Sequence, residues 1–381
     1  MKNRALLSLL SLAAPVAAFA VSPYINKVYD FRPAPGQFVN VIPEYEPGDD
    51  YNSMLAKAQE ALAFDRMPGA VSLGAFGGFV VFGFDHTVAN VAGEYDFKIY
   101  GNAIISDKNA QGGSCEPGVV WVAADTNGNG LPDDEWYELL GSEADRAIHG
   151  FSVTYRRPDP NHKPTPDPSD KHLIDTTYLP FTASDGTAGY LAANDYHLQS
   201  YWPEWLDSEE LTFTGVRLPD NAMDVSGNGS YFVLKMFPYG YADNCPNSQD
   251  PGFKIDWAVD AEGNPAHLPG IDFVKVVTGS HQQAGSLGET STEVCGAEDL
   301  HPEVAGVSAA EIPTWQVYAT GDILHSVNPA DGITLPLYDT RGIKVADIHL
   351  PSGATAISLK HLAPGLYLLP LPDARTLRIR L

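Results

Sequence analysis

The 381-residue chain is poor in basic residues, with 23 Lys and Arg against 48 Asp and Glu and a formal net charge of −25. Nucleic-acid-binding surfaces need a positively charged footprint, so this balance excludes a phosphate-backbone partner. Beyond the first 20 residues there is no run of 18 apolar residues, and we expect no transmembrane segment in the mature chain. Apolar residues still make up 44 %, which is enough for a folded core.

Cysteine is also scarce. The three cysteines, Cys115, Cys245 and Cys295, form no C-x-x-C pair, which argues against a thiolate zinc site. An odd number permits one disulfide, for which Cys245–Cys295 is one pairing, and leaves one thiol over. The spacing does not decide the pairing.

The motifs of common hydrolases are absent from the sequence. Neither a Gly-x-Ser-x-Gly elbow nor a His-Glu-x-x-His helix occurs, and the histidines are scattered. Asp85-His86 is a candidate acid–base pair, and Asp256 with Asp272 could be paired as glycosidase carboxylates are. Among 48 acidic residues such pairs can always be found, so we expect a protein without enzymatic activity.

Residues 1–20 have the pattern of a secretory signal peptide. Lys2 and Arg4 precede an apolar stretch over 5–13, and Ala18-Phe19-Ala20 places small residues at the two positions that a signal peptidase reads. The alternative, a buried N-terminal helix, would be interrupted by a proline. The pattern therefore predicts export and a mature chain that begins at Val21.

The charge is distributed unevenly along the chain. Residues 21–314 hold 43 acidic and 15 basic residues, whereas residues 315–381 hold 5 acidic and 6 basic ones. This asymmetry predicts two units, a body over 21–305 and a C-terminal module over 315–381, joined by a linker over 306–314. In the module, apolar and polar residues alternate between glycine-containing turns, which is typical of short strands.

The body has the pattern of an all-β fold. Its turn spacing favours an antiparallel β-sandwich or jelly roll over alternating βαβ units. Leu55, Ala58 and Leu62 recur at helical spacing and predict one short helix that covers an edge or end of a sheet. The proline-rich stretch 157–168 is expected to be an exposed loop. The expected strands are 79–84, 95–100, 119–124, 151–155, 211–216, 231–237 and 273–278.

One segment has the spacing of a calcium loop, D-x-N-x-N-G-x-x-D. Calcium takes about six to eight oxygen ligands, and the spacing offers Asp125, Asn127, Asn129, the Leu131 carbonyl and Asp133. A glycine stands at the sharp turn, but the bidentate glutamate usual at the twelfth position is missing. Three interpretations stay open: a structural ion that stiffens the loop, an ion that bridges a ligand, and a turn without an ion.

Two further segments are candidates for ligand binding. The aromatic one could offer flat faces to sugars or flat cofactors, or it could pack in the core. The other, on an expected loop, could bind a polar ligand or a second cation, or it could hold a turn with Asx side chains. The candidate residues are Tyr201, Trp202 and Trp205 in the first segment, and Tyr241, Asp243 and Asn244 in the second.

The body resembles a group of secreted "cell surface proteins" of Bacteroidota. The resemblance is carried by a Gly-rich first strand, VSLGAFGGFVVFGFDH, and a second strand ending in Gly-Asn, EYDFKIYGNA. It implies surface exposure, a jelly-roll fold and ligand binding, and it supplies no catalytic residues. The matching segments are 71–86, 94–103, 116–143, 241–247 and 271–294.

The tail resembles the C-terminal sorting domain of the type IX secretion system. The matching pieces are LYDTRGIKV (337–345), AISLKHLAPGLYLL (356–369) and the terminal TLRIRL, which is arginine-based where the family usually ends in lysines. The resemblance implies a small immunoglobulin-like β-sandwich and the outer-membrane secretion machinery as a partner. A generic β-module of the same fold is the alternative.

These features predict a secreted, non-catalytic ligand-binding protein on the outer cell surface, stabilised by calcium. The expected ligand is a carbohydrate or a small nutrient such as a corrinoid, the latter implied only by the resembling group. A carbohydrate-active hydrolase and a structural or adhesive surface protein are the alternatives.

Overall fold

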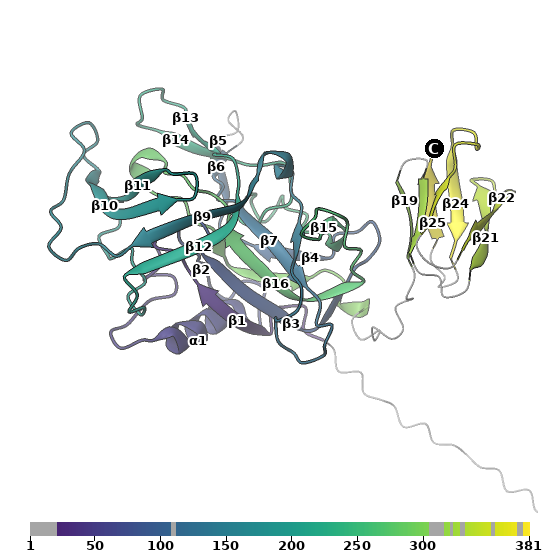
Figure 1. Cartoon of the computed structure of the whole chain (residues 1–381), viewed down its shortest axis with the longest axis horizontal. Coiled ribbons are helices and arrows are strands. Elements are labelled where there is room, and N and C mark those ends of the chain that lie inside the picture. Colours follow the sequence, from purple (N-terminus) through teal and green to yellow (C-terminus); the bar gives the residue numbers. More distant parts are fainter. Residues whose placement is uncertain are drawn as a thin grey trace, which may run out of the picture. The chain divides into compact units, whose positions relative to one another are not determined.

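The chain divides into two units, Met1–Gly306 and Val307–Leu381 (Figure 1). The predicted signal peptide and linker lie outside the residues that the computed structural model describes, so neither prediction is tested. Those described residues are 21–107, 112–304, 316–320, 323–327, 332–351, 355–371 and 376–381.

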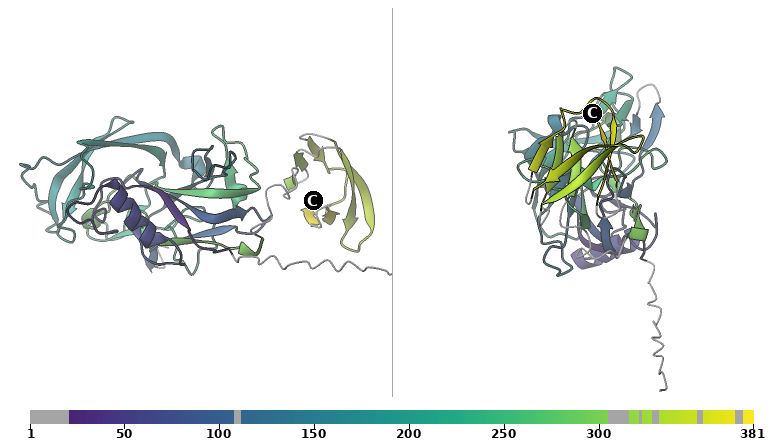
Figure 2. Two further views of the ribbon diagram at one scale, coloured as in Figure 1. Left: turned by 90° about the horizontal axis from the view of Figure 1, so that it is seen from below. Right: turned by 90° about the vertical axis from the view of Figure 1, so that its right-hand side faces the viewer.

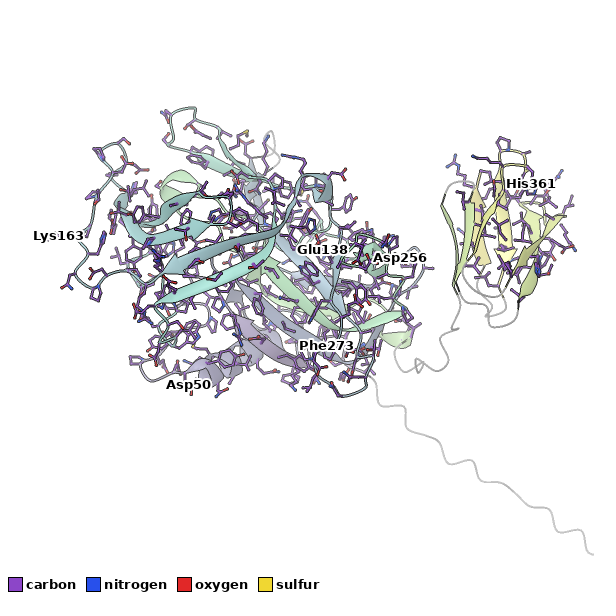
Figure 3. The ribbon with its side chains drawn as sticks, viewed as in Figure 1. Asp50, Glu138, Lys163, Asp256, Phe273 and His361 are labelled. Carbon is purple, nitrogen blue, oxygen red and sulfur yellow. The ribbon has the colours of Figure 1, made fainter. Side chains whose placement is uncertain are left out.

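A six-stranded antiparallel sheet, in the order β1–β3–β16–β7–β8–β15, runs through the first unit. Its central strands are rich in valine and phenylalanine, and β7, β16 and the first half of β3 are mostly buried, because other layers cover both faces. Phe273 of β16 marks this layer in Figure 3. The strands are β1 Lys27–Arg32, β3 Phe79–Ala89, β16 Gly270–Thr278, β7 Gly118–Ala123, β8 Tyr137–Leu139 and β15 Ala258–Val259.

A four-stranded antiparallel sheet, β11–β10–β9–β12, forms a second layer. Val216 of β12 and the following Leu218 are buried against Val119 of β7, which joins the two sheets into a sandwich (Figure 1). The all-β, antiparallel fold predicted from the sequence is thus confirmed. The strands are β9 Ile148–Arg156, β10 Leu173–Ala183, β11 Ala188–Asn194 and β12 Glu210–Arg217.

The predicted helix is present as α1, Tyr51–Leu62, and it covers the edge strand β1 (Figure 2). Its N-cap is Asp50, whose carboxylate accepts a hydrogen bond from the Ser53 N–H at 2.9 Å. The Gln59 side chain accepts the Val28 N–H at 2.6 Å and donates to the Asn26 carbonyl at 3.0 Å, so it satisfies the open side of β1. The helix buries Met54, Ala58 and Leu62 in the main core.

Short strands complete the first unit and bring distant segments together. One sheet has the order β13–β14–β6–β5, and two further pairs are β17–β2 and β18–β4. Among the described residues no helix is both long and apolar enough to cross a bilayer. The bounds are β2 Val71–Ser72, β4 Phe97–Tyr100, β5 Ile104–Asp107, β6 Gly112–Ser114, β13 Ala222–Asp224, β14 Phe232–Lys235, β17 Glu293–Val294 and β18 Gly296–Asp299.

The second unit is a small sandwich of two antiparallel sheets, β19–β20–β23 and β22–β21–β24–β25. Leu324, Leu337, Leu350 and Leu369 are fully buried between them. This arrangement confirms the predicted small β-sandwich. The strands are β19 Gln316–Thr320, β20 Ile323–Val327, β21 Ile333–Asp339, β22 Lys344–Leu350, β23 Thr355–Ser358, β24 Leu366–Pro370 and β25 Thr376–Arg380.

Candidate functional site

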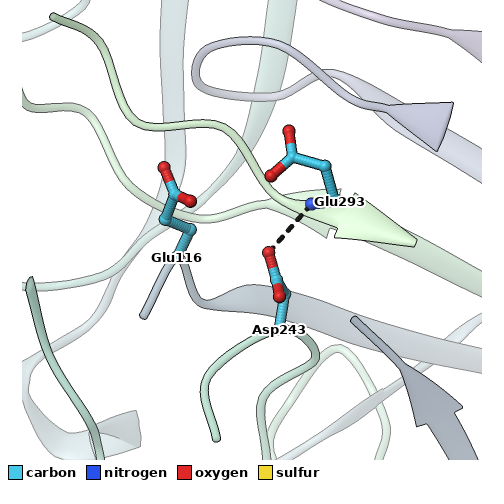
Figure 4. Close-up of side chains that lie close together, drawn as sticks. All are labelled: Glu116, Asp243 and Glu293. Carbon is cyan, nitrogen blue, oxygen red and sulfur yellow. Dashed lines mark hydrogen bonds between the residues drawn. The ribbon is translucent and has the colours of Figure 1, made fainter. Parts of the chain in front are cut away.

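Three carboxylates from distant parts of the chain meet inside the first unit: Glu116, Asp243 and Glu293 (Figure 4). We call them the carboxylate cluster. One oxygen of each lies within 4.8 Å of the others. Asp243 and Glu293 are only 3 % and 2 % exposed, and Glu116 is partly buried. Such a group of oxygens is a candidate cation site, and no ion is part of the structure.

Asp243 is placed by backbone donors. Its Oδ1 accepts the Asn102 and Ala103 N–H groups at 2.7 and 2.8 Å, and its Oδ2 accepts the Glu293 N–H at 3.0 Å (Figure 4). Its own φ is 52°, a left-handed conformation that a non-glycine residue rarely adopts. Glycine is required at Gly101, because a Cβ there would lie 2.3 Å from Asp243 Oδ1.

The other two carboxylates are held by uncharged donors. Glu116 accepts the Ser114 hydroxyl at 2.9 Å and the Ser291 N–H at 3.2 Å. Glu293 accepts the Ser291 hydroxyl at 2.7 Å and the Asn102 side-chain amide at 3.2 Å. These bonds fix the carboxylates without offsetting their charge.

Burial therefore dominates the protonation of the cluster. It raises the pKa of Glu293 to about 7. Burial together with the charge of Glu293 raises the pKa of Glu116 and of Asp243 well above their ordinary values. The cluster can thus hold protons near neutral pH, or it can hold a cation that neutralises the carboxylates.

Of the second predicted ligand segment, only Asp243 joins this cluster. The Asn244 side chain accepts the Phe237 N–H at 2.7 Å and donates to the Phe237 carbonyl at 2.9 Å, so it clamps a turn. Tyr241 is buried beside Phe237, and its hydroxyl accepts the Glu143 N–H at 2.9 Å. Both side chains serve the fold.

The predicted calcium loop connects β7 to β8 and is mostly exposed. The Asp125 carboxylate accepts the N–H groups of Asn129 and Gly130 at 3.0 and 2.8 Å. The Asp133 carboxylate accepts the side-chain amides of Asn127 and Asn129, each at 3.0 Å. The four predicted side chains thus converge.

The predicted backbone ligand of this loop is engaged with the chain itself. The Leu131 carbonyl accepts the Asp133 N–H at 2.9 Å. The hydrogen bonds of the loop are those of an Asx-stabilised turn, and this geometry by itself does not decide whether an ion is bound.

The predicted aromatic segment packs inward. Tyr201 and Trp202, which is 1 % exposed, belong to the apolar core that packs on the sheet of β9, β10 and β11. Trp205 is stacked on Phe31 in the main core, with ring centroids 6.4 Å apart. These rings form no exposed stacking platform, which agrees with the core alternative. Trp202 nevertheless lines a cavity.

That cavity has a volume of about 560 Å³ and lies between the proline-rich stretch, β10 and residues 197–204. The stretch is exposed, as predicted, and Lys163 marks its outer side in Figure 3. Buried Trp202 and Asp175 line the inner part of the cavity, whereas Asp159 and Glu204 are exposed at its rim.

Asp175 is fully engaged inside this cavity. Its carboxylate accepts the N–H groups of Thr165 and Thr177 at 3.1 and 3.0 Å, and its Oδ2 lies 2.7 Å from His162 Nε2. Burial opposes ionisation, but these hydrogen bonds outweigh it and lower the pKa of Asp175. Asp175 is therefore an anchored carboxylate that positions His162.

Comparison of the chain with family models and with curated proteins gives no match.

The other residues singled out from the sequence have separate roles. His86 lies between Asp85 and Asp299, so it is part of a closed ion-pair arrangement. Asp256 accepts a hydrogen bond from Asn90 at 2.9 Å. Asp272 instead accepts the Thr87 hydroxyl at 2.6 Å and the Asp125 N–H at 2.7 Å. All three cysteines are free thiols in the structure.

Sequence reasoning missed Glu116, Glu293 and the cavity. Glu116 stands two residues before the apolar strand β7, and Glu293 ends the polar run 289–293 and begins the short strand β17. An acidic residue at such a place is a signal for a buried carboxylate. No local spacing could have joined them, because the members of the cluster lie more than 40 residues apart in the chain.

Proposed function

We propose that this protein is a secreted binding protein of the outer cell surface that holds a sugar-sized ligand in the cavity beside the proline-rich stretch. The observation that carries the proposal is the cavity itself. Its volume of about 560 Å³ falls within the range of about 300–1,000 Å³ that is usual for small-molecule sites.

The lining suits a carbohydrate. Proline rings, Ile174 and Tyr178 supply apolar faces for the carbon skeleton of a sugar. Arg157, His162 and Gln199 supply polar groups for its hydroxyls. A corrinoid is much larger than such a cavity, which favours the carbohydrate over that nutrient.

The carboxylates favour binding over hydrolysis. A glycosidase needs an acid with a raised pKa opposite a second carboxylate at the cleft. In this protein the pKa of Asp175 is lowered, and the carboxylates whose pKa values are raised most, those of the carboxylate cluster and Glu289, do not line the cavity.

Calcium and export belong to the same proposal. The D-x-N-x-N-G-x-x-D spacing, with the side chains of Asp125, Asn127, Asn129 and Asp133 gathered in the loop between β7 and β8, supports a calcium site there. The signal pattern at residues 1–20 and the sorting-domain resemblance of the tail support secretion through the outer membrane.

A glycan array followed by titration calorimetry on the mature chain tests the proposal. We expect at least one mono- or oligosaccharide to bind. Ala193→Phe, which fills the cavity from β11, should weaken that binding at least tenfold. Ala188→Phe, on an exposed position of the same strand, is the control and should leave it unchanged. Absence of any glycan ligand, or binding that Ala193→Phe does not alter, would overturn the proposal.

A further inference from the structure

The inner wall of the cavity contains a buried donor without an acceptor. The Trp202 Nε1 atom has no hydrogen-bond partner among the described residues, although its side chain is 1 % exposed. Buried N–H groups in folded proteins are nearly always paired. Trp202 also lines the cavity, so a ligand atom that reaches this indole from the cavity would supply the missing acceptor.

Arg157 lies beside this indole and is held in place by carbonyl oxygens. Its Cζ stands 5.4 Å from the centre of the Trp202 ring. Its Nη2 donates to the Leu206 carbonyl, and its Nε donates to the Ser208 carbonyl at 3.4 Å. These bonds orient the guanidinium and leave its Nη1 without a hydrogen bond to any described residue.

The charge of Arg157 is poorly matched by the protein. Its one ion-pair partner within the described residues is Glu209, 4.0 Å away and with a side chain that is 82 % exposed. Such a pair contributes little. Asp175 is occupied by Thr165, Thr177 and His162, and the remaining acids of the cavity, Asp159 and Glu204, are exposed at its rim.

We infer that the ligand carries a carboxylate, as a uronic acid does, and that Arg157 and Trp202 bind this group. The inference rests on the proposed function and names the ligand class of the same cavity. A guanidinium matches the geometry of a carboxylate, and the neighbouring indole N–H supplies a further donor. The sugar ring then lies against Tyr178 and the proline rings.

Titration calorimetry with free monosaccharides tests the inference on the mature chain. The probes are glucuronate and galacturonate, their neutral counterparts glucose and galactose, and acetate as a carboxylate without a sugar. We expect a uronate to bind at least ten times more tightly than its neutral counterpart. The uronate affinity should also fall as salt is added, because salt screens the charge pair.

Two variants assign the roles. Arg157→Gln should weaken uronate binding at least tenfold and remove the preference over the neutral sugar. Trp202→Phe should weaken it several-fold. Trp205→Phe is the matched control and should have no effect, because the Trp205 Nε1 also lacks a partner among the described residues but Trp205 does not line the cavity. Melting curves establish whether each variant is folded. If Trp202→Phe does not fold, Arg157→Gln alone tests the inference.

The outcomes separate this inference from the proposed function. If a neutral sugar binds as tightly as its uronate and Arg157→Gln does not change the affinity, the carboxylate inference is overturned, but the proposed sugar binding is not. Acetate that binds as tightly as the uronates supports the carboxylate contact and overturns the sugar class. If none of these probes binds and the glycan array is also empty, both proposals fail.

Discussion

His86 is held between two carboxylates that belong to distant parts of the chain. Its Nδ1 lies 2.6 Å from Asp85 Oδ1, and its Nε2 lies 2.7 Å from Asp299 Oδ2. Burial lowers the pKa of His86, but the hydrogen bonds and charges of Asp299 and Asp85 outweigh it, so the pKa is raised. The protonated imidazole thus ties β3 to the end of β18.

This arrangement predicts a pH-dependent stability. A raised folded-state pKa gives stabilisation that is complete below about pH 6.5, the value for an unfolded histidine, and is lost as the pH rises through the folded pKa. His86→Gln should lower the free energy of unfolding by about 1–3 kcal/mol at pH 6 and by less at pH 9.

Urea unfolding at the two pH values measures the effect. The control is His172→Gln, because His172 pairs with Asp195 at 2.9 Å but both side chains are substantially exposed. An equal loss at pH 6 and pH 9, or an equal effect of the control, would contradict the charged role of His86.

Glu289 is a buried carboxylate, and one of its oxygens accepts no hydrogen bond from the described residues. Its Oε1 accepts the Gln37 N–H at 2.7 Å, whereas its Oε2 has no partner among the described residues. Burial raises the pKa of Glu289 to about 8. The folded chain therefore retains a proton that the unfolded chain releases near pH 4.5, so the free energy of unfolding falls as the pH rises from 4.5 to about 8.

Glu289→Gln should remove this pH-dependent decrease in the free energy of unfolding. The variant keeps the shape and the acceptor for Gln37 but carries no charge, so it should exceed the wild type at pH 8 by up to roughly 4 kcal/mol and match it near pH 4.5. Chemical denaturation across this range provides the measurement. A variant that is less stable than the wild type at every pH would show that the carboxylate is favourably solvated or bound.

The loop between β7 and β8 and the carboxylate cluster offer two different places for a cation. Calcium at roughly 1 mM should raise the melting temperature by about 2–4 °C, and a chelator should reverse the rise. Asp125→Ala should abolish this response if the loop holds the ion.

A second variant separates the two places. Glu293→Gln removes a member of the carboxylate cluster and leaves the loop intact, so it should retain the calcium response. If the response survives Asp125→Ala and is lost in Glu293→Gln, the cation belongs to the cluster. A melting curve that is unchanged by millimolar calcium counts against an occupied site at either place.

The elements that the sequence predicts well are those whose pattern is local. The apolar spacing of α1 and the valine-rich runs of β3, β7 and β16 are visible without any partner. β10 is different, because threonines and Pro180 interrupt its alternation. Pro180 is tolerated because β9 pairs with β10 only over Phe181–Ala183, one residue further along.

The candidate sites depend on contacts between distant segments. Two strand contacts bring the members of the carboxylate cluster together. Glu293 pairs with Ser72, and the bridge between Gly118 and Ala242 places the segments of Glu116 and Asp243 side by side. No pattern within one segment encodes such a register. Asp243 could be predicted because it lies in a segment rich in polar and aromatic residues, whereas its two partners lie elsewhere in the chain.

The uneven charge of the whole chain has a thermodynamic consequence. Residues 21–314 carry 43 acidic and 15 basic residues, and residues 315–381 are almost balanced. A high net charge destabilises a compact state through self-repulsion, which salt screens. Each unit has its own buried apolar core, so we expect two separate unfolding transitions.

Calorimetry of the full chain at about 10 mM and about 300 mM salt tests this expectation. The transition of the larger unit should move upward by several degrees, while that of the smaller unit stays in place and serves as an internal control. A ligand of the cavity should likewise shift only the first transition, because it binds the larger unit alone. A single transition would mean that the two units unfold as one, and equal shifts of two transitions would mean that the charge of the body does not limit its stability.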